Sequence, residues 1–80
     1  MNNKLVEIIG WLGMAAIIFA YALLNFNVIT QGMLMYPLLN LFGAIAIVYH
    51  SFKKKDYQPG VLNIIWSLIA IFAIIKLLLI

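Results

Sequence analysis

The sequence predicts an all-α membrane protein with three transmembrane helices. Hydrophobic residues make up 68% of the 80-residue chain and charged residues 9%, against roughly 45–50% and 25% in soluble domains. Residues 8–52 contain no Asp, Glu, Lys or Arg. As a single helix they would extend about 68 Å, roughly twice the thickness of a bilayer core. That run must therefore turn back, and residues 1–80 are predicted to form a single three-helix domain in the lipid bilayer.

The first helix is predicted at residues 5–24, because polar residues and a glycine gather directly after it. Residues 25–32 read NFNVITQG, which is typical of a turn. Within the helix, small residues recur at steps of three and four, a spacing that lets another helix approach closely in a membrane. These residues are Gly10, Gly13, Ala16 and Ala20.

The second helix is predicted at residues 31–52, which leaves two interpretations of Pro37. If the helix begins near Pro37, the proline only starts it; if the helix begins at residue 31, the proline removes a backbone hydrogen bond and creates a hinge. One side of this helix carries polar or small residues together with one isoleucine. They are Tyr36, Asn40, Gly43, Ile47 and His50.

The third helix is predicted at residues 58–79, after the loop sequence KKKDYQ. Pro59 suits the first turn of this helix, with Asp56 or Gln58 as the cap. Lys76 can extend its ammonium group to the membrane surface. The side that we expect to pack against the other helices is formed by Pro59, Asn63, Ser67 and Ala70, with Trp66 beside them.

The lysines predict the orientation of the chain. Lys4 and the run at residues 53–55 fall on one side of the membrane, and Lys76 alone lies towards the other. Lysine-rich ends usually stay in the cytoplasm. We therefore expect a multi-pass protein with its amino terminus and second loop in the cytoplasm.

Two asparagines in apolar sequence, Asn40 and Asn63, leave two interpretations open. An amide within the bilayer needs a partner, since lipid offers none. Each asparagine either bonds a neighbouring helix and holds the bundle together, or lines a cavity that binds a neutral polar solute. Trp66 and Tyr36 would shape such a pocket.

Several function classes find no support in the residues. The chain has no catalytic triad pattern, no paired carboxylates and no phosphate-binding loop, so we expect it not to be an enzyme. With one histidine and no cysteine, no metal site or cofactor is predicted. The net charge of +3 comes largely from one loop, so no nucleic-acid partner is expected.

Three stretches carry a resemblance to a known family. AYALLNF (20–26), YPLLNLFGA (36–44) and PGVLNIIWSLIAIFAI (59–74) resemble a group of small uncharacterised bacterial membrane proteins. That group is similar, more remotely, to the SemiSWEET sugar transporters of the PQ-loop superfamily. The resemblance implies a SemiSWEET-like triple-helix bundle whose third helix packs between the first two. It also implies a parallel homodimer around a solute pathway and, because the group is bacterial, the inner membrane.

These observations predict a homodimeric transporter that moves a small neutral polar solute by alternating access. Asn40 and Asn63 would bind the solute, and the resemblance places Asn63 where an asparagine contacts the sugar in SemiSWEETs. Pro37 and Gly43 would allow bending. The alternative is a structural or accessory membrane protein whose asparagines only mediate helix packing.

Overall fold

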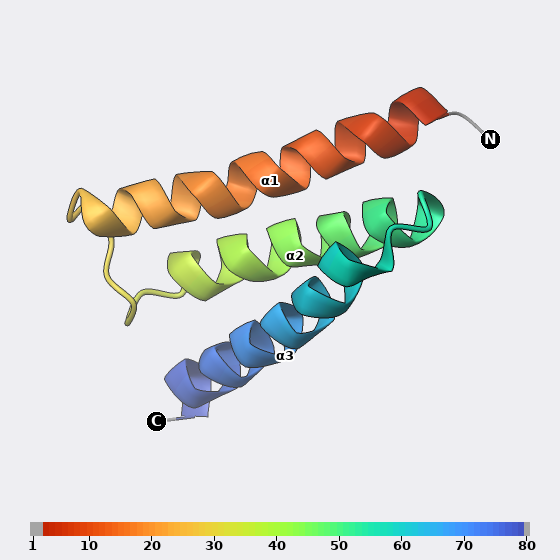
Figure 1. Cartoon of the computed structure of the whole chain (residues 1–80). Coiled ribbons are helices and arrows are strands. Elements are labelled where there is room, and N and C mark those ends of the chain that lie inside the picture. Colours follow the sequence, from red (N-terminus) through yellow and green to blue (C-terminus); the bar gives the residue numbers. More distant parts are fainter. Residues whose placement is uncertain (1–2, 80) are drawn as a thin grey trace.

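The computed structural model describes residues 3–79, which form three long helices joined by two loops (Figure 1). The helices are α1 (Asn3–Asn25), α2 (Met35–Lys53) and α3 (Tyr57–Leu79). Each is long and apolar enough to cross a membrane, and no strand occurs among the described residues. The predicted fold class, an all-α membrane protein with three spans, is confirmed. Residues 1, 2 and 80 of the predicted domain lie outside the described range.

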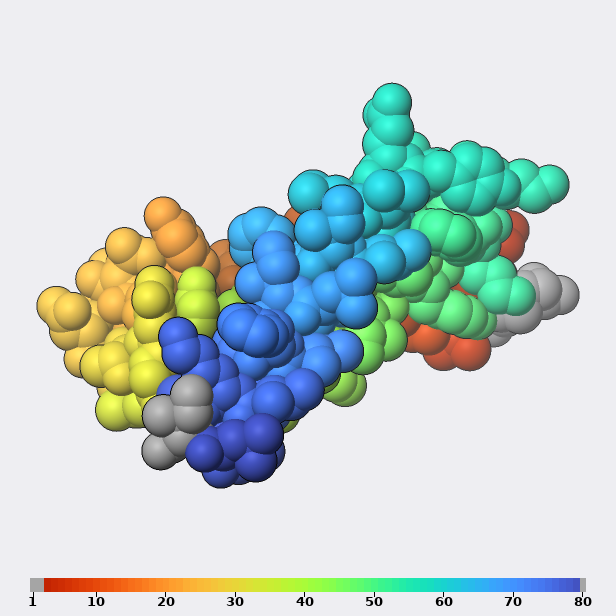
Figure 2. Space-filling model, turned by 90° about the horizontal axis from the view of Figure 1, so that it is seen from below, coloured from red at the N-terminus to blue at the C-terminus, as the bar shows by residue number. Residues whose placement is uncertain are grey.

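The central element of the bundle is α2. It packs against both α1 and α3, whereas α1 and α3 make no close contact with each other within residues 3–79. Figure 1 shows α1 antiparallel to α2, and α3 diverging from the end where α2 finishes. In Figure 2 the blue α3 crosses in front of the green α2, with parts of α1 visible behind.

The helix order implied by the SemiSWEET resemblance is therefore wrong, since the second helix lies between the other two. Lipid accepts apolar side chains on every face of a helix, so hydropathy carries little information about helix order.

Small residues form the contacts between the helices. In α1 the buried residues are Val6, Gly13 and Ala20, which recur every seven residues and so share one face. In α3 they are Gly60, Asn63 and Ala70. Most large apolar side chains point outward instead. This is the distribution expected of helices that meet through small residues and are surrounded by lipid.

The loop between α1 and α2 ends α1 and is longer than the sequence predicted, so α2 begins later in the chain. Asn27 takes the left-handed conformation with φ 64°, a common way to end a helix. The N–H of Val28 then donates to the Leu23 carbonyl over 2.9 Å. Further turns follow, so α2 begins at Met35, four residues after the predicted start at residue 31.

The second turn ends α2 with the same left-handed geometry. Lys55 has φ 59°, and the N–H of Asp56 donates to the Ser51 carbonyl over 2.9 Å. This bond closes the helix in the manner of a Schellman motif. The start of α1 and the lysine-bearing loop lie at the same end of the bundle (Figure 1), which will be called the lysine end.

Candidate functional site

A pocket of about 370 Å³ lies between α2 and α3, towards the end opposite the lysine end. It brings together three of the four residues predicted to bind solute and a predicted hinge residue: Tyr36, Asn40, Trp66 and Pro37. Gln31, Ile69, Ala70 and Ala73 complete its lining. These eight residues will be called the amide pocket. None of them carries a formal charge, so the pocket suits a neutral molecule.

The start of α2 positions one wall of the amide pocket. Tyr36 and Asn40 are four residues apart, so they lie on the same helix face one turn from each other. Pro37 is buried between them. Trp66 and Ala70 have the same spacing in α3 and form the opposite wall.

The side chain of Asn40 faces this pocket with no protein partner. The residue is only 8% exposed, and its amide makes no hydrogen bond with any residue from 3 to 79. No fully buried side-chain nitrogen or oxygen atom among residues 3–79 lacks a partner, so the unbonded amide of Asn40 is open to the pocket. A ligand with donor and acceptor groups could bond this amide.

Gln31 contributes a second amide that the sequence analysis missed. It was assigned to the turn and the start of the second helix, and no role in binding was predicted. It lines the amide pocket from the loop before α2. The signal that could have identified it is its position: a polar residue five residues before Tyr36, in the loop that leads into the start of α2.

Asn63 does not join Asn40 in the amide pocket. Its side-chain N–H₂ group donates to the Pro59 carbonyl over 2.8 Å, and the Ser67 hydroxyl donates to the Asn63 backbone carbonyl over 2.8 Å. Both bonds stay within α3. Asn40 and Asn63, which were both predicted to bind the solute, therefore do not line the same pocket, and Asn63 bonds to its own helix instead of to a neighbour.

The other predicted packing and hinge residues have defined places. Pro37 lies in the first turn of α2, where the Met33 carbonyl already accepts the N–H of Tyr36 over 3.1 Å. This agrees with the helix-start interpretation, because the missing N–H of Pro37 leaves no helical bond broken. Pro59 likewise lies in the first turn of α3. Gly13 and Gly43 are both buried where α1 meets α2.

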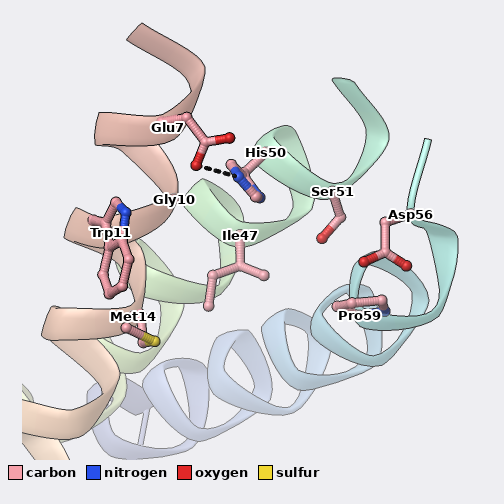
Figure 3. A pocket seen from close by; sticks show the side chains of 9 residues that line it. All are labelled: Glu7, Gly10, Trp11, Met14, Ile47, His50, Ser51, Asp56 and Pro59. Carbon is pink, nitrogen blue, oxygen red and sulfur yellow. Dashed lines mark ion pairs between the residues drawn. The ribbon is translucent and has the colours of Figure 1, made fainter. Parts of the chain in front are cut away.

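A second pocket, of about 310 Å³, lies at the lysine end (Figure 3). Here Lys54 donates to Oε2 of Glu7, while Nε2 of His50 lies 3.6 Å from Oε1 of the same carboxylate. Gly10 makes this possible, since a Cβ atom there would lie 2.6 Å from the His50 ring. These polar contacts join the start of α1 to the end of α2.

The sequence analysis did not predict this cluster. Glu7 and Lys54 are 47 residues apart, so only the fold brings them together. Among the described residues no group of three His, Cys, Asp or Glu side chains is placed to hold a metal ion.

The comparison with known proteins assigns the chain to a family. The model of a small uncharacterised family matches residues 6–79. The chain belongs to this family. The match covers α2 and α3 completely and α1 from Val6 onward, and it includes every residue of the two pockets described above. No curated protein and no solved structure matches the chain.

Proposed function

We propose that the protein is a homodimeric transporter that moves a small neutral polar solute across the bacterial inner membrane by alternating access. The unpartnered amide of Asn40 in an uncharged pocket carries this proposal. The amides of Asn40 and Gln31 offer donors and acceptors, the Tyr36 hydroxyl offers both, and the Trp66 ring offers an apolar face. This combination suits a molecule with hydroxyl or amide groups. The proposal includes no catalytic step.

A second copy would complete the amide pocket. Only α2, α3 and the first loop line it, so one chain leaves the pocket open on the sides that these elements do not cover. A symmetric dimer would bring the same open face of another copy against it. For the pocket to open first to one side of the membrane and then to the other, the two chains would have to move relative to each other at the dimer contact. The fold of each chain would stay the same. The lysine end would face the cytoplasm.

The rival proposal is a structural or accessory protein whose asparagines hold helices together. It requires bonds from these amides to neighbouring helices. Within residues 3–79 Asn63 bonds only its own helix and Asn40 bonds none. The observed hydrogen bonds therefore favour solute binding over interhelical bonding.

Single-cysteine labelling tests the proposal, because the natural chain has no cysteine. We expect Asn40→Cys to react with a membrane-impermeant thiol reagent from either side, in right-side-out and in inverted vesicles. Leu68→Cys, on an outward-facing position, should stay unlabelled in lipid. Asn63→Cys should react far more slowly than Asn40→Cys, because position 63 is buried outside the pocket.

Three results would change the conclusion. Labelling of Asn40→Cys from only one side would leave a binding site without alternating access. Its failure to react in folded protein would remove the transport proposal. A monomeric mass, measured for the purified protein in lipid nanodiscs, would remove the dimer.

A further inference from the structure

The pocket at the lysine end has a chemistry different from that of the amide pocket. It is lined by residues of α1, α2 and the start of α3, with Glu7 on one side and Asp56 on the other (Figure 3). Trp11, Met14, Ile47 and Pro59 provide apolar walls. It will be called the carboxylate pocket.

One of the two carboxylates in this pocket lacks a cation. Glu7 is bound by Lys54 and lies beside His50. Asp56 forms no ion pair with any residue between 3 and 79. The exposed carboxylate of Asp56 therefore has no cation in contact with it among the described residues, and a cation from outside the chain can reach it.

The sequence around Asp56 explains why its carboxylate makes no helix-capping hydrogen bond and can bind a ligand. Asp56 directly precedes α3, the position where an aspartate usually accepts the N–H of the second or third helical residue. The third residue here is Pro59, which has no N–H. No side-chain capping bond from Asp56 is present in the described structure. In Figure 3 the carboxylate lies over Pro59 at the edge of the pocket.

Ser51 provides independent evidence for a ligand. The residue is 2% exposed and lines the carboxylate pocket, and its hydroxyl makes no hydrogen bond with the described residues. Because no fully buried side-chain oxygen or nitrogen atom among these residues lacks a partner, the hydroxyl oxygen is open to the pocket. Figure 3 shows this hydroxyl directed towards the space between Ile47 and Asp56. The backbone bond from Asp56 N–H to the Ser51 carbonyl holds the two side chains on one side of the pocket.

We propose that the carboxylate pocket binds a primary ammonium group, with Asp56 as its counter-ion and the Ser51 hydroxyl as a second acceptor. An ammonium group has three donors, which suit a carboxylate and a hydroxyl on the same side. Trp11 adds an aromatic face that attracts cations, beside the apolar side chains of Met14 and Ile47. A metal ion fits poorly, since calcium and magnesium take six or more oxygen ligands.

The position of the pocket indicates where such a ligand comes from. The lysine end is the membrane surface, where aminophospholipid headgroups lie. The exposed lysines at residues 53 and 55 would attract the phosphate of the same headgroup. A free organic amine has the same ammonium chemistry and is the alternative source. The proposal does not depend on transport through the amide pocket.

The two tryptophans of the chain allow a direct test, because Trp11 lines the carboxylate pocket and Trp66 the amide pocket. In the Trp66→Phe variant Trp11 is the single tryptophan, so the fluorescence of the protein reports on the carboxylate pocket alone. The protein would be placed in phosphatidylcholine vesicles that contain, in separate samples, the same fraction of brominated phosphatidylcholine, phosphatidylethanolamine or phosphatidylglycerol. Brominated acyl chains quench tryptophan fluorescence on contact. A separate titration would use soluble ethanolamine.

We expect brominated phosphatidylethanolamine to quench Trp11 more strongly than either other lipid. Asp56→Asn should weaken this preference about tenfold, which corresponds to the loss of a hydrogen bond to a charged group. Ser51→Ala should weaken it less. Gln58→Ala, an exposed neighbour outside the pocket, is the matched control and should not change it. Circular dichroism would establish that each variant is folded.

The remaining outcomes decide between sources or overturn the proposal. A response to ethanolamine without lipid selectivity would support the ammonium site and assign it to a free amine. Stronger quenching by phosphatidylglycerol would show that the lysines select anionic lipid, and would overturn it. Equal quenching by all lipids with no response to ethanolamine would also overturn it, as would full selectivity in folded Asp56→Asn.

Discussion

Gly13 and Gly43 lie backbone against backbone where α1 crosses α2. A Cβ atom added at Gly13 would lie 2.7 Å from the Gly43 carbonyl oxygen, and one added at Gly43 would lie 2.6 Å from the Gly13 carbonyl oxygen. Both distances are shorter than real Cβ contacts. The helices can approach this closely only because neither residue has a side chain.

Replacing either glycine by alanine should therefore push the helices apart. We expect Gly13→Ala and Gly43→Ala each to lower the free energy of unfolding by about 1–3 kcal/mol, the usual cost of overpacking. The double variant should cost less than the sum, since one displacement of α1 relieves both clashes. Unfolding followed by circular dichroism in mixed detergent micelles measures these effects.

Gly32→Ala is the control for this prediction. An added Cβ there would meet only the Thr30 hydroxyl oxygen, at 3.8 Å. Its effect should be within about 0.5 kcal/mol, as for other surface substitutions. Equal losses at all three glycines would show that the α1–α2 contact is not the tight point of the fold.

The contact between Glu7 and Lys54 predicts recovery by charge exchange. Glu7→Lys places two ammonium groups together and should lower the melting temperature of the protein. Adding Lys54→Glu should restore part of the loss, because the opposite charges meet again. Both side chains are over 40% exposed, so the recovery should shrink in high salt.

The neighbouring lysine tests the specificity of this pair. Lys53 lies over the Tyr49 ring, with its Nζ 5.7 Å from the ring centre, and has no ion pair with Glu7 in the described structure. Adding Lys53→Glu to Glu7→Lys should restore less than Lys54→Glu does. The same recovery from both lysines would mean that only net charge matters at this end.

The sequence predicted the three spans because length and hydropathy decide them. Three of the eight residues that line the amide pocket were singled out from the sequence, since Tyr36 and Asn40 share a face of one helix and Trp66 was expected beside the packing side of another. Gly13 lies at a helix contact, as its spacing indicated. These features depend on local periodicity, which can be read from the chain.

The missed features depend on the arrangement of helices or on bonds within one helix. Helix order is decided by small differences in packing between apolar faces. The contact of Glu7 with Lys54 needed that arrangement, although their shared side of the membrane was predictable. The bond from Asn63 to Pro59 is local, and their four-residue spacing was a usable signal, because short polar side chains often bond the preceding helical turn.

The two asparagines should respond differently to truncation. Asn63→Ala removes a hydrogen bond within α3 and side-chain volume at a buried position, so we expect it to lower the unfolding free energy by about 1 kcal/mol. Asn40→Ala removes an amide that has no partner within residues 3–79, so stability should stay the same or rise slightly. Chemical unfolding of both variants in the same detergent is the measurement.

A stability-neutral Asn40→Ala would mean that Asn40 is retained for binding and not for folding. Asn40→Asp is the companion variant, because it adds a charge to the uncharged amide pocket and should destabilise the protein. If Asn40→Ala instead costs more than Asn63→Ala, Asn40 holds the helices together. The accessory-protein alternative would then gain support.

Lys55 predicts a stabilising substitution. A non-glycine residue in the left-handed conformation costs roughly 1–2 kcal/mol, and Lys55 has φ 59°. Lys55→Gly should therefore raise the free energy of unfolding by about 0.5–1 kcal/mol, after the greater freedom of glycine in the unfolded chain is subtracted.

Lys53→Gly, two residues earlier in the last turn of α2, should instead destabilise the protein, because glycine is a poor helix former. A loss of stability in Lys55→Gly would contradict the left-handed turn at this position. A gain would show that the lysine is kept at a cost to stability, as expected if its charge is needed at the membrane surface.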